Sequence, residues 1–375
     1  MDNPLKTIFG NIEKMIKGTE DGAVGIDIGT SAIKVVEIKK KGGRVILETY
    51  GIIELGPYAD LDIGATTNLS VEKIADALKE VLKQSSVSSN SGVLSIPVQS
   101  SLIFTIQLPS QVKADEMLSI VSIEARKYIP VPIAEVSLDY FVLPNKEASF
   151  EELNREHVEE VKIDKMNVLV VATQNDAVAK FRSILAECKI ESPFFEIEIF
   201  SSIRSNFEHE LSPVLLIDFG ASRTKLSIVE FGMVKSFHSI ERGGAYITES
   251  ISKSLSMSFA EAEKIKKEFG LYGSPTEKSL ADVIKIHIDY IMSETNNVLL
   301  SYEKKYNRTI SKVIFSGGGA LMKGLKEVSA NNFQAEIEIG HPFSKVKTPE
   351  FLQKVLDTMG PEFAVAMGLA LRKLQ

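Results

Sequence analysis

The sequence predicts an α/β protein made of two similar halves, with a second block of strands and helices inserted into the first half. The main observation is an internal repeat, because Asp27–Lys34 and Asp218–Lys225 both read D-x-G-x-S-x-x-K. Each copy follows an apolar run and leads into a strand, a glycine turn, another strand and then a helix. Self-similarity of this kind is typical of duplicated half-molecules, so we expect two βββα halves.

Composition places the chain among ordinary globular proteins. Hydrophobic residues make up 44% and charged residues 25% of the sequence. Its length of 375 residues is enough for two or three domains. No apolar stretch approaches the roughly 18–20 residues that span a bilayer, and the N-terminus lacks the layout of a secretory signal. The single cysteine, Cys188, excludes an internal disulfide and predicts a reducing compartment. A net charge of −7 argues against general nucleic-acid binding.

The first half is expected to begin after a short N-terminal segment. Residues 4–17 place apolar side chains at helical spacing, which indicates an amphipathic helix docked on the protein, on a partner or on a membrane. Three strands are then expected over Val24–Ile28, Ile33–Lys39 and Val45–Glu54. Ser70 is a typical N-cap for the helix that follows, and Val93–Ile96 is a buried strand.

Residues 98–188 form the expected insertion, an α+β block. Its strands are predicted over Leu102–Leu108, Leu138–Val142 and Val168–Ala172, and its helices over Lys113–Ile129 and Asp176–Glu187. The stretch 146–165 is rich in glutamate, which is typical of a solvated loop but also suits a docking surface.

The second half repeats the order of the first. Its strands are expected over Val214–Ile217, Thr224–Glu230 and Met233–Ser239. A helical region follows from Ala245 to about residue 306, with one break at Gly270–Pro275. The strand Lys312–Ser316 then runs into the triple glycine Gly317–Gly319, and a helix rich in small residues is predicted over Glu362–Leu374.

The two D-x-G turns carry residues that suit a nucleotide. Glycine lets the backbone approach a phosphate closely, and turn amides point their N–H groups at an anion. The hydroxyls of Thr30 and Ser31 add donors, and Lys34 adds a point charge. An aspartate at a strand end instead favours the waters of Mg²⁺. One such turn could be an ordinary hairpin, but two in the same context predict a grip on phosphates from both sides.

These motifs resemble those of the actin-like ATPase superfamily. Gly25–Lys34, Leu216–Gly220 and Ser316–Ala320 look like its phosphate-1, phosphate-2 and adenosine motifs, although the triple glycine by itself would also suit a tight turn. Further stretches resemble the PilM family of type IV pilus assembly proteins, and with the motifs they cover about residues 22–375. These stretches are Gly25–Glu37, Glu124–Pro130, Val170–Asp176 and Ala364–Arg372.

The resemblance implies an α/β, actin-like ATPase fold of duplicated ribonuclease-H-like halves with an inserted α+β subdomain of the 1C type. It also implies a division of the chain. The expected parts are an N-terminal helix at 1–21, subdomain 1A at 22–97, 189–210 and 361–375, subdomain 1C at 98–188, subdomain 2A at 211–250 and 311–360, and subdomain 2B at 251–310.

The resemblance further assigns roles to particular residues, with ATP and Mg²⁺ as the ligands. Asp27 and Asp218 would hold hydrated Mg²⁺ through waters. The phosphates would be contacted by Gly29, Thr30, Ser31, Lys34 and Gly220. The adenosine would be contacted by Glu263, Lys266, Gly317, Gly318 and Gly319. Without the family, Glu263 and Lys266 would be interpreted as an exposed ion pair on a helix.

Two further acids stand out by their spacing. Glu196 and Glu198 alternate with apolar residues, so both are expected on one face of a strand over 195–199. Glu198 is the candidate for a water-positioning acid, and a solvent-facing strand edge is the alternative. The second turn, 218–222, lacks the extra glycines or threonines of many relatives. We therefore expect ATP to be bound with weak or no hydrolysis.

For function, the resemblance implies a cytoplasmic, ATP-binding component of the type IV pilus assembly platform, at the inner face of the inner membrane. Its partner would be the N-terminal peptide of PilN, bound in a groove between subdomains 1A and 1C. Other pilus platform and motor components would also bind, with membrane association only through partners, no nucleic acid, and a homo-oligomer left open. Nucleotide would set the conformation of the peptide groove.

Two alternatives remain on the same fold. A small-molecule kinase is disfavoured because no loop before the second half has a dense set of polar substrate-binding residues. An FtsA-like filament-forming cell-division protein is disfavoured because no basic amphipathic helix follows the last predicted helix.

Overall fold

The computed structural model describes residues 22–143, 165–208, 210 and 212–374. The helix predicted at 4–17 and nearly all of the glutamate-rich stretch at 146–165 lie outside the described residues. The chain divides into two compact units, one comprising Met1–Ser95 with Leu185–Gln375 and the other Ile96–Ile184. Within the described ranges, no helix combines the length and apolar character that a membrane crossing requires.

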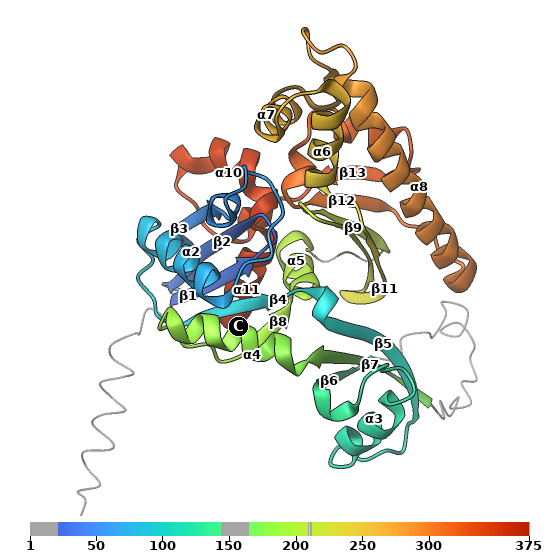
Figure 1. Cartoon of the computed structure of the whole chain (residues 1–375). Coiled ribbons are helices and arrows are strands. Elements are labelled where there is room, and N and C mark those ends of the chain that lie inside the picture. The colour runs from blue at the N-terminus through green and yellow to red at the C-terminus, as the bar shows by residue number, and fades with distance from the viewer. Residues whose placement is uncertain (1–21, 144–164, 209, 211, 375) are drawn as a thin grey trace, which may run out of the picture. The chain divides into compact units, whose positions relative to one another are not determined.

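The larger unit contains two five-stranded sheets of the same design (Figure 1). The first comprises β1 (Gly22–Ile28), β2 (Ala32–Lys41), β3 (Arg44–Glu54), β4 (Gly92–Ile96) and β8 (Phe195–Ile197), in the order β3-β2-β1-β4-β8. The second comprises β9 (Val214–Phe219), β10 (Thr224–Glu230), β11 (Met233–Ile240), β12 (Lys312–Ser316) and β13 (Glu336–Ile339), in the order β11-β10-β9-β12-β13. In both sheets the first three strands are antiparallel and the fourth pairs parallel with the first. The predicted duplication is therefore confirmed.

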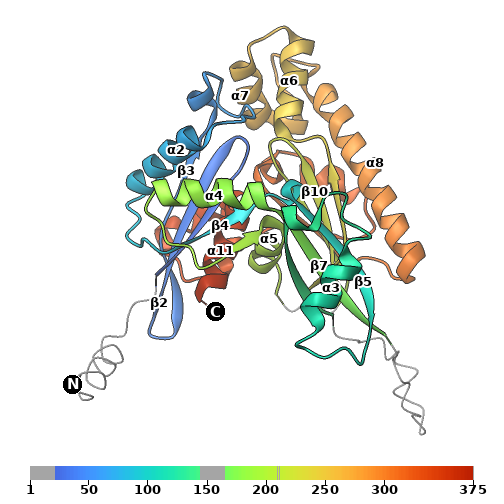
Figure 2. The same cartoon turned by 60° about the horizontal axis from the view of Figure 1, so that its bottom comes forward.

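The helices of the first half bury apolar faces against its sheet. Helix α2 (Val71–Gln84) begins where predicted, because the Ser70 hydroxyl accepts a hydrogen bond from the Lys73 amide. Helix α11 (Ala364–Leu374) packs on β1, on β2 and on α5 (Glu198–Asn206). Figure 2 shows α11 beside α5. Two glycines allow this close approach. A Cβ on Gly25 would lie 1.8 Å from the Ala366 carbonyl oxygen, and one on Gly368 would lie 1.8 Å from that of Ser201.

The second sheet shares one apolar core with three helices, α6 (Gly244–Leu255), α7 (Phe259–Phe269) and α8 (Leu280–Tyr306). A capping box of Ser258 and Glu261 begins α7 and separates it from α6, so the helical region has a second break that the sequence prediction lacked. A helix was expected after the triple glycine, and α9 (Leu325–Ala330) lies there, but α10 (Gln353–Met359) and the strand β13 were not predicted.

The smaller unit is a three-stranded antiparallel sheet with one helix on its apolar face. Its strands are β5 (Ser101–Pro109), β6 (Val136–Val142) and β7 (Lys165–Gln174), in the order β5-β7-β6. The residues of α3 (Met117–Ala125) that face the sheet include Val121 and Ala125, which are fully buried. Helix α4 (Asn175–Glu187) follows β7.

Two sequence predictions need correction. The helix predicted over Lys113–Ile129 is only Met117–Ala125, because the amides of Tyr128 and Ile129 both turn back to the Ala125 carbonyl just before Pro130, which disfavours helix. The strand predicted over 195–199 ends at Ile197, and Glu198 begins helix α5. Five alternating residues cannot distinguish a strand from a strand-to-helix junction.

Candidate functional site

The two sequence repeats fold into matching hairpins. The Gly29 amide donates to the Ala32 carbonyl, and the Gly220 amide donates to the Arg223 carbonyl. The N–O distance is 3.0 Å in both hydrogen bonds. Asp27 pairs with Lys34 across β1 and β2, and Asp218 pairs with Lys225 across β9 and β10. Directly paired residues of antiparallel strands lie on the same face. Each repeat therefore encodes a tight turn with an aspartate and a lysine side by side beneath it.

The carbonyls of the two turns are held by different neighbours. In the first turn, the Thr30 carbonyl accepts from the Thr67 amide and hydroxyl, and the Ser31 carbonyl accepts from Leu55. These donors belong to the loop 55–67 that follows β3. Within the described residues, the Thr30 and Ser31 amides donate no hydrogen bond, which leaves them for an anion.

In the second turn, the Gly220 carbonyl accepts from the Gly244 amide and the Ala221 carbonyl accepts from the Ala245 amide. Both N–O distances are 2.9 Å. These two donors begin α6. The second turn is thus joined to the start of a helix, whereas the first is joined to a loop.

Asp27 is buried at the end of β1, with 8% of its surface exposed. The Ser95 hydroxyl donates to its Oδ1 over 3.0 Å. Burial raises the pKa of Asp27 above its ordinary value, and the nearby ammonium groups of Lys34 and Lys225 oppose this rise. This carboxylate therefore depends on neighbouring cations for its charge.

Asp218 and Glu198 converge on one ammonium group. The Lys225 Nζ lies 2.6 Å from Glu198 Oε2 and 3.1 Å from Asp218 Oδ2. Burial would lower the pKa of Lys225, but the two carboxylates raise it above its usual value, so the group is a permanent cation. The alternative that placed Glu198 on a solvent-facing edge is wrong, because Glu198 is 8% exposed and in this ion pair.

The pair Glu263 and Lys266 is also buried, at 7% and 8% exposure. The Lys266 ammonium donates to Glu263 Oε2 over 2.6 Å, to the Thr248 hydroxyl over 2.7 Å and to the Gly244 carbonyl over 3.0 Å. Burial would raise the pKa of Glu263, but Lys266 and Thr248 hold it below its usual value. The two residues form an ion pair, as the alternative interpretation expected, but the pair is buried and not exposed. Their contact with ribose and base stays a prediction.

The loop 55–67 reaches this pair from the first half. Gly64 has a φ of +88°, and a Cβ there would lie 2.9 Å from the Glu263 carboxyl carbon. One loop therefore contacts both the first turn and the Glu263 side chain of the second half.

The triple glycine follows β12 and packs against the second hairpin. Gly317 has a φ of +78°, and its amide donates to the Pro361 carbonyl. A Cβ on Gly317 would lie 2.5 Å from Asp218 Oδ1, and one on Gly319 would lie 2.3 Å from the Phe219 ring. Both glycines are required by close packing. The structure therefore places Gly317 against Asp218 and Phe219, and the adenosine role stays a prediction.

Of the two acids predicted to hold hydrated Mg²⁺, Asp218 is paired with the Lys225 ammonium and Asp27 accepts from the Ser95 hydroxyl. The carboxylates of Asp218 and Glu198 face the Lys225 ammonium, whereas Mg²⁺ requires carboxylates that face its own waters. Among the described residues, no three or more His, Cys, Asp or Glu side chains are grouped so as to hold a metal ion. The residues present therefore do not fit a preformed Mg²⁺ site.

Glu196, the other acid singled out in the sequence, has a structural role. Its carboxylate accepts from Arg204 over 2.7 and 2.8 Å, from Arg372 over 2.5 Å and from Ser201. It ties β8 to α5 and α11 and is not at the hairpins.

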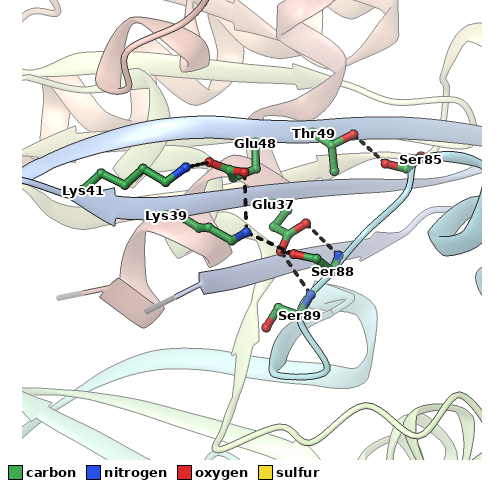
Figure 3. Close-up of polar contacts among 8 residues, drawn as sticks. All are labelled: Glu37, Lys39, Lys41, Glu48, Thr49, Ser85, Ser88 and Ser89. Carbon is green, nitrogen blue, oxygen red and sulfur yellow. Dashed lines mark hydrogen bonds and ion pairs between the residues drawn. The ribbon is translucent and has the colours of Figure 1, made fainter. Parts of the chain in front are cut away.

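Glu37 was not predicted, and it anchors the segment that leads into β4. Its buried carboxylate accepts from the Ser88 amide and hydroxyl and from the Ser89 amide over 2.7–3.1 Å, as Figure 3 shows. Ser88 and Ser89 lie directly before β4, the strand that carries Ser95 to Asp27. The sequence gives no signal for this contact, because the partners are about 50 residues apart.

Sequence reasoning also missed Lys225, although a signal was present. Lys225 is the last residue of the second D-x-G-x-S-x-x-K copy and the counterpart of Lys34. Applying the repeat residue by residue would have found it.

The comparisons with known proteins agree with this architecture. The family model for type IV pilus assembly protein PilM matches residues 25–374. Cell division protein FtsA of Staphylococcus epidermidis is 25% identical, over 88% of this chain and 76% of that protein, and FtsA of Bacillus subtilis is 22% identical over 88% and 81%.

Solved structures of the same fold include a PilM–PilN type IV pilus biogenesis complex, with a TM-score of 0.78 and 24% identity over 95% of this chain and 99% of that chain. MreB5 of Spiroplasma citri bound to ADP has a TM-score of 0.50 and 13% identity over 94% and 96%. These likenesses establish the actin-like ATPase fold. Because its family model covers nearly the whole sequence, the chain belongs to the PilM family of type IV pilus assembly proteins.

Proposed function

We propose that this chain is an ATP-binding component of the type IV pilus assembly platform, and that ATP binds where the two D-x-G hairpins meet. The observation that carries the proposal is the pair of matching hairpins, in which Asp27 pairs with Lys34 and Asp218 pairs with Lys225 across neighbouring strands. The nucleotide in the MreB5 structure supports the same use of this fold.

The chain's own residues divide the work of binding. The Thr30 and Ser31 amides and the Lys34 ammonium would hold phosphate oxygens, because N–H groups of a turn and a lysine are suited to anions. Gly317–Gly319 would lie against the adenosine, with the Glu263–Lys266 pair at the ribose and base. The nucleotide itself supplies the phosphate charge that these groups neutralise.

We expect little hydrolysis of ATP. An acid that positions water needs an oxygen available for it, and Glu198 Oε2 already accepts from the Lys225 ammonium. Binding and release of the nucleotide would then matter more than turnover.

The proposed partner is the N-terminal peptide of a PilN-like protein, supported by the PilM–PilN complex among the solved structures. Such a partner, with other platform and motor components, would bring the protein to the inner face of the inner membrane. If nucleotide changes the affinity for the peptide, the peptide must change the affinity for nucleotide by the same factor.

A calorimetric titration with ATP, with and without the peptide, tests this function. We expect ATP binding that Lys34→Met weakens by about tenfold or more, since a charge-assisted bond to phosphate is lost. We also expect equal coupling factors in the two orders of addition. Binding of neither ligand would refute the proposal. ATP binding with equal peptide affinity in its presence and absence would refute the coupling.

The FtsA relatives keep one alternative open to test. A filament-forming protein should sediment with ATP in a concentration-dependent manner, whereas the pilus assembly role requires only binding.

A further inference from the structure

Lys225 lies between two acidic side chains of the proposed site. Its ammonium bridges Glu198 Oε2 and Asp218 Oδ2, and the three side chains are only 11–16% exposed. Asp27 acts on the same ammonium from the first half. Two acids, from α5 and β9, are thus paired with one lysine of β10, and the charge of Asp27 on β1 also acts on that lysine.

The net charge of the acids and lysines around the two hairpins also indicates that Lys225 neutralises the acids. When ionised, Asp27, Glu198 and Asp218 contribute three negative charges, and Lys34 and Lys225 contribute two positive charges. Removing Lys225 would leave two net negative charges, which is the charge that one divalent cation neutralises. A cluster that carries its own cation has less need of a bound metal ion.

The two lysines are not equivalent, although they end the same motif. Among the described residues, no carboxylate forms an ion pair with Lys34, and its ammonium lies 3.9 Å from where a Cβ on Gly29 would be. Lys34 is therefore placed to meet a phosphate at the first turn, whereas Lys225 neutralises acids.

We propose that Lys225 is a built-in counter-ion that replaces the hydrated divalent cation, so that the protein binds ATP nearly equally well with and without Mg²⁺. This inference rests on the nucleotide function proposed above. It assigns Lys225 as a positioning residue, which fixes the charge and orientation of Glu198 and Asp218.

The test compares the dissociation constant for ATP in excess Mg²⁺ and in EDTA, by calorimetry on the full chain. For the natural protein we expect the two values to agree within about threefold. In Lys225→Met, binding in EDTA should weaken by about tenfold or more and recover in Mg²⁺, because the freed acids can then hold the hydrated ion. Mg²⁺ alone should bind this variant and not the natural protein.

Two matched variants separate charge from structure. Lys34→Met should weaken ATP binding by a similar factor in both media, and Lys225→Arg should behave as the natural protein does. If Lys225→Met does not fold, the comparison of the natural protein in Mg²⁺ and in EDTA still answers the question, because it needs no variant.

Other outcomes are equally decisive. A natural protein whose ATP affinity falls by more than about thirtyfold in EDTA would overturn the role of Lys225 while leaving nucleotide binding intact. A Lys225→Met variant with the natural Mg²⁺ dependence would do the same. Absence of ATP binding in both media would overturn the proposed function itself.

Discussion

The two D-x-G-x-S-x-x-K hairpins have the same turn bond and the same strand register, yet their surroundings give them opposite characters. In the first, the aspartate is buried and accepts from a serine, while Lys34 stands beside the turn. In the second, the aspartate and lysine are paired to each other and to Glu198. The two copies thus share their backbone conformation. Residues outside the repeat determine which partners the aspartate and the lysine of each copy have.

The strands beside the hairpins extend the comparison. Ser316 on β12 pairs with Asp218, and Ser95 on β4 stands one residue beyond Leu94, the partner of Ile26. The two serines are therefore equivalent in the two halves. The Ser95 hydroxyl donates to Asp27, but that of Ser316 donates to the Pro361 carbonyl over 3.2 Å. Equivalent positions again serve different partners.

The largest expected effect is on stability and sets Lys225 against Lys34. Lys225→Met should lower the free energy of unfolding by about 3 kcal/mol, because it leaves two largely buried acids without their cation. Lys34→Met should cost less than about 1 kcal/mol. Urea unfolding of both variants measures this, and equal losses would show that the two hairpins do not differ in this way.

The next effect concerns the glycine turn that follows β12. Gly319→Ala should destabilise the protein by about 2–3 kcal/mol, because the new methyl group would overlap the buried Phe219 ring. Gly318→Ala is the matched control, since its methyl group would lie 3.7 Å from Glu362, an ordinary contact. The Gly319→Ala variant should melt at a clearly lower temperature than Gly318→Ala. Similar melting temperatures would mean that β12 and β9 can move apart to accommodate the methyl group.

A smaller difference is expected between the equivalent serines. Ser95→Ala should cost about 2 kcal/mol, since it removes a hydrogen bond to a buried carboxylate. Ser316→Ala should cost about 1 kcal/mol, because its partner is a neutral carbonyl. Chemical denaturation at neutral pH measures both, and the reverse order would contradict the comparison.

The smallest effect is a dependence on pH. Burial raises the pKa of Asp27 in the folded protein, so protonation of this group favours the folded state. That stabilisation is complete below the ordinary pKa of 3.8 and is lost as pH rises through the raised value. Asp27→Asn should therefore be slightly more stable than the natural protein at neutral pH, with the difference vanishing in acid.

Asp218→Asn provides the contrast for that measurement. It removes one partner of Lys225, so it should lower stability at neutral pH. Urea midpoints across a pH series would show the two asparagine variants moving in opposite directions from the natural protein. If the urea midpoints of both variants shift in the same direction from that of the natural protein, the environments of Asp27 and Asp218 do not differ in this way.

The sequence could predict the fold because its signals were local or repeated. The repeat located both hairpins, and apolar runs located their strands. The region around Glu198 could not be predicted, because a three-residue strand and the first turn of α5 share one alternating pattern. The ion pair of Glu198 with Lys225 joins α5 to β10, and only the folded chain brings those elements together.

The packing of α11 on β1 has a consequence for synthesis on the ribosome. The Lys373 ammonium donates to the Gly22 carbonyl across 351 residues, and Gly25 lies against the backbone of Ala366. The ribosome synthesises β1 early and α11 late. The first sheet therefore lacks α11, one of its covering helices, until the second half has been synthesised. Contacts of such long sequence separation form slowly. The nascent first half therefore exposes an apolar sheet that chaperones can recognise.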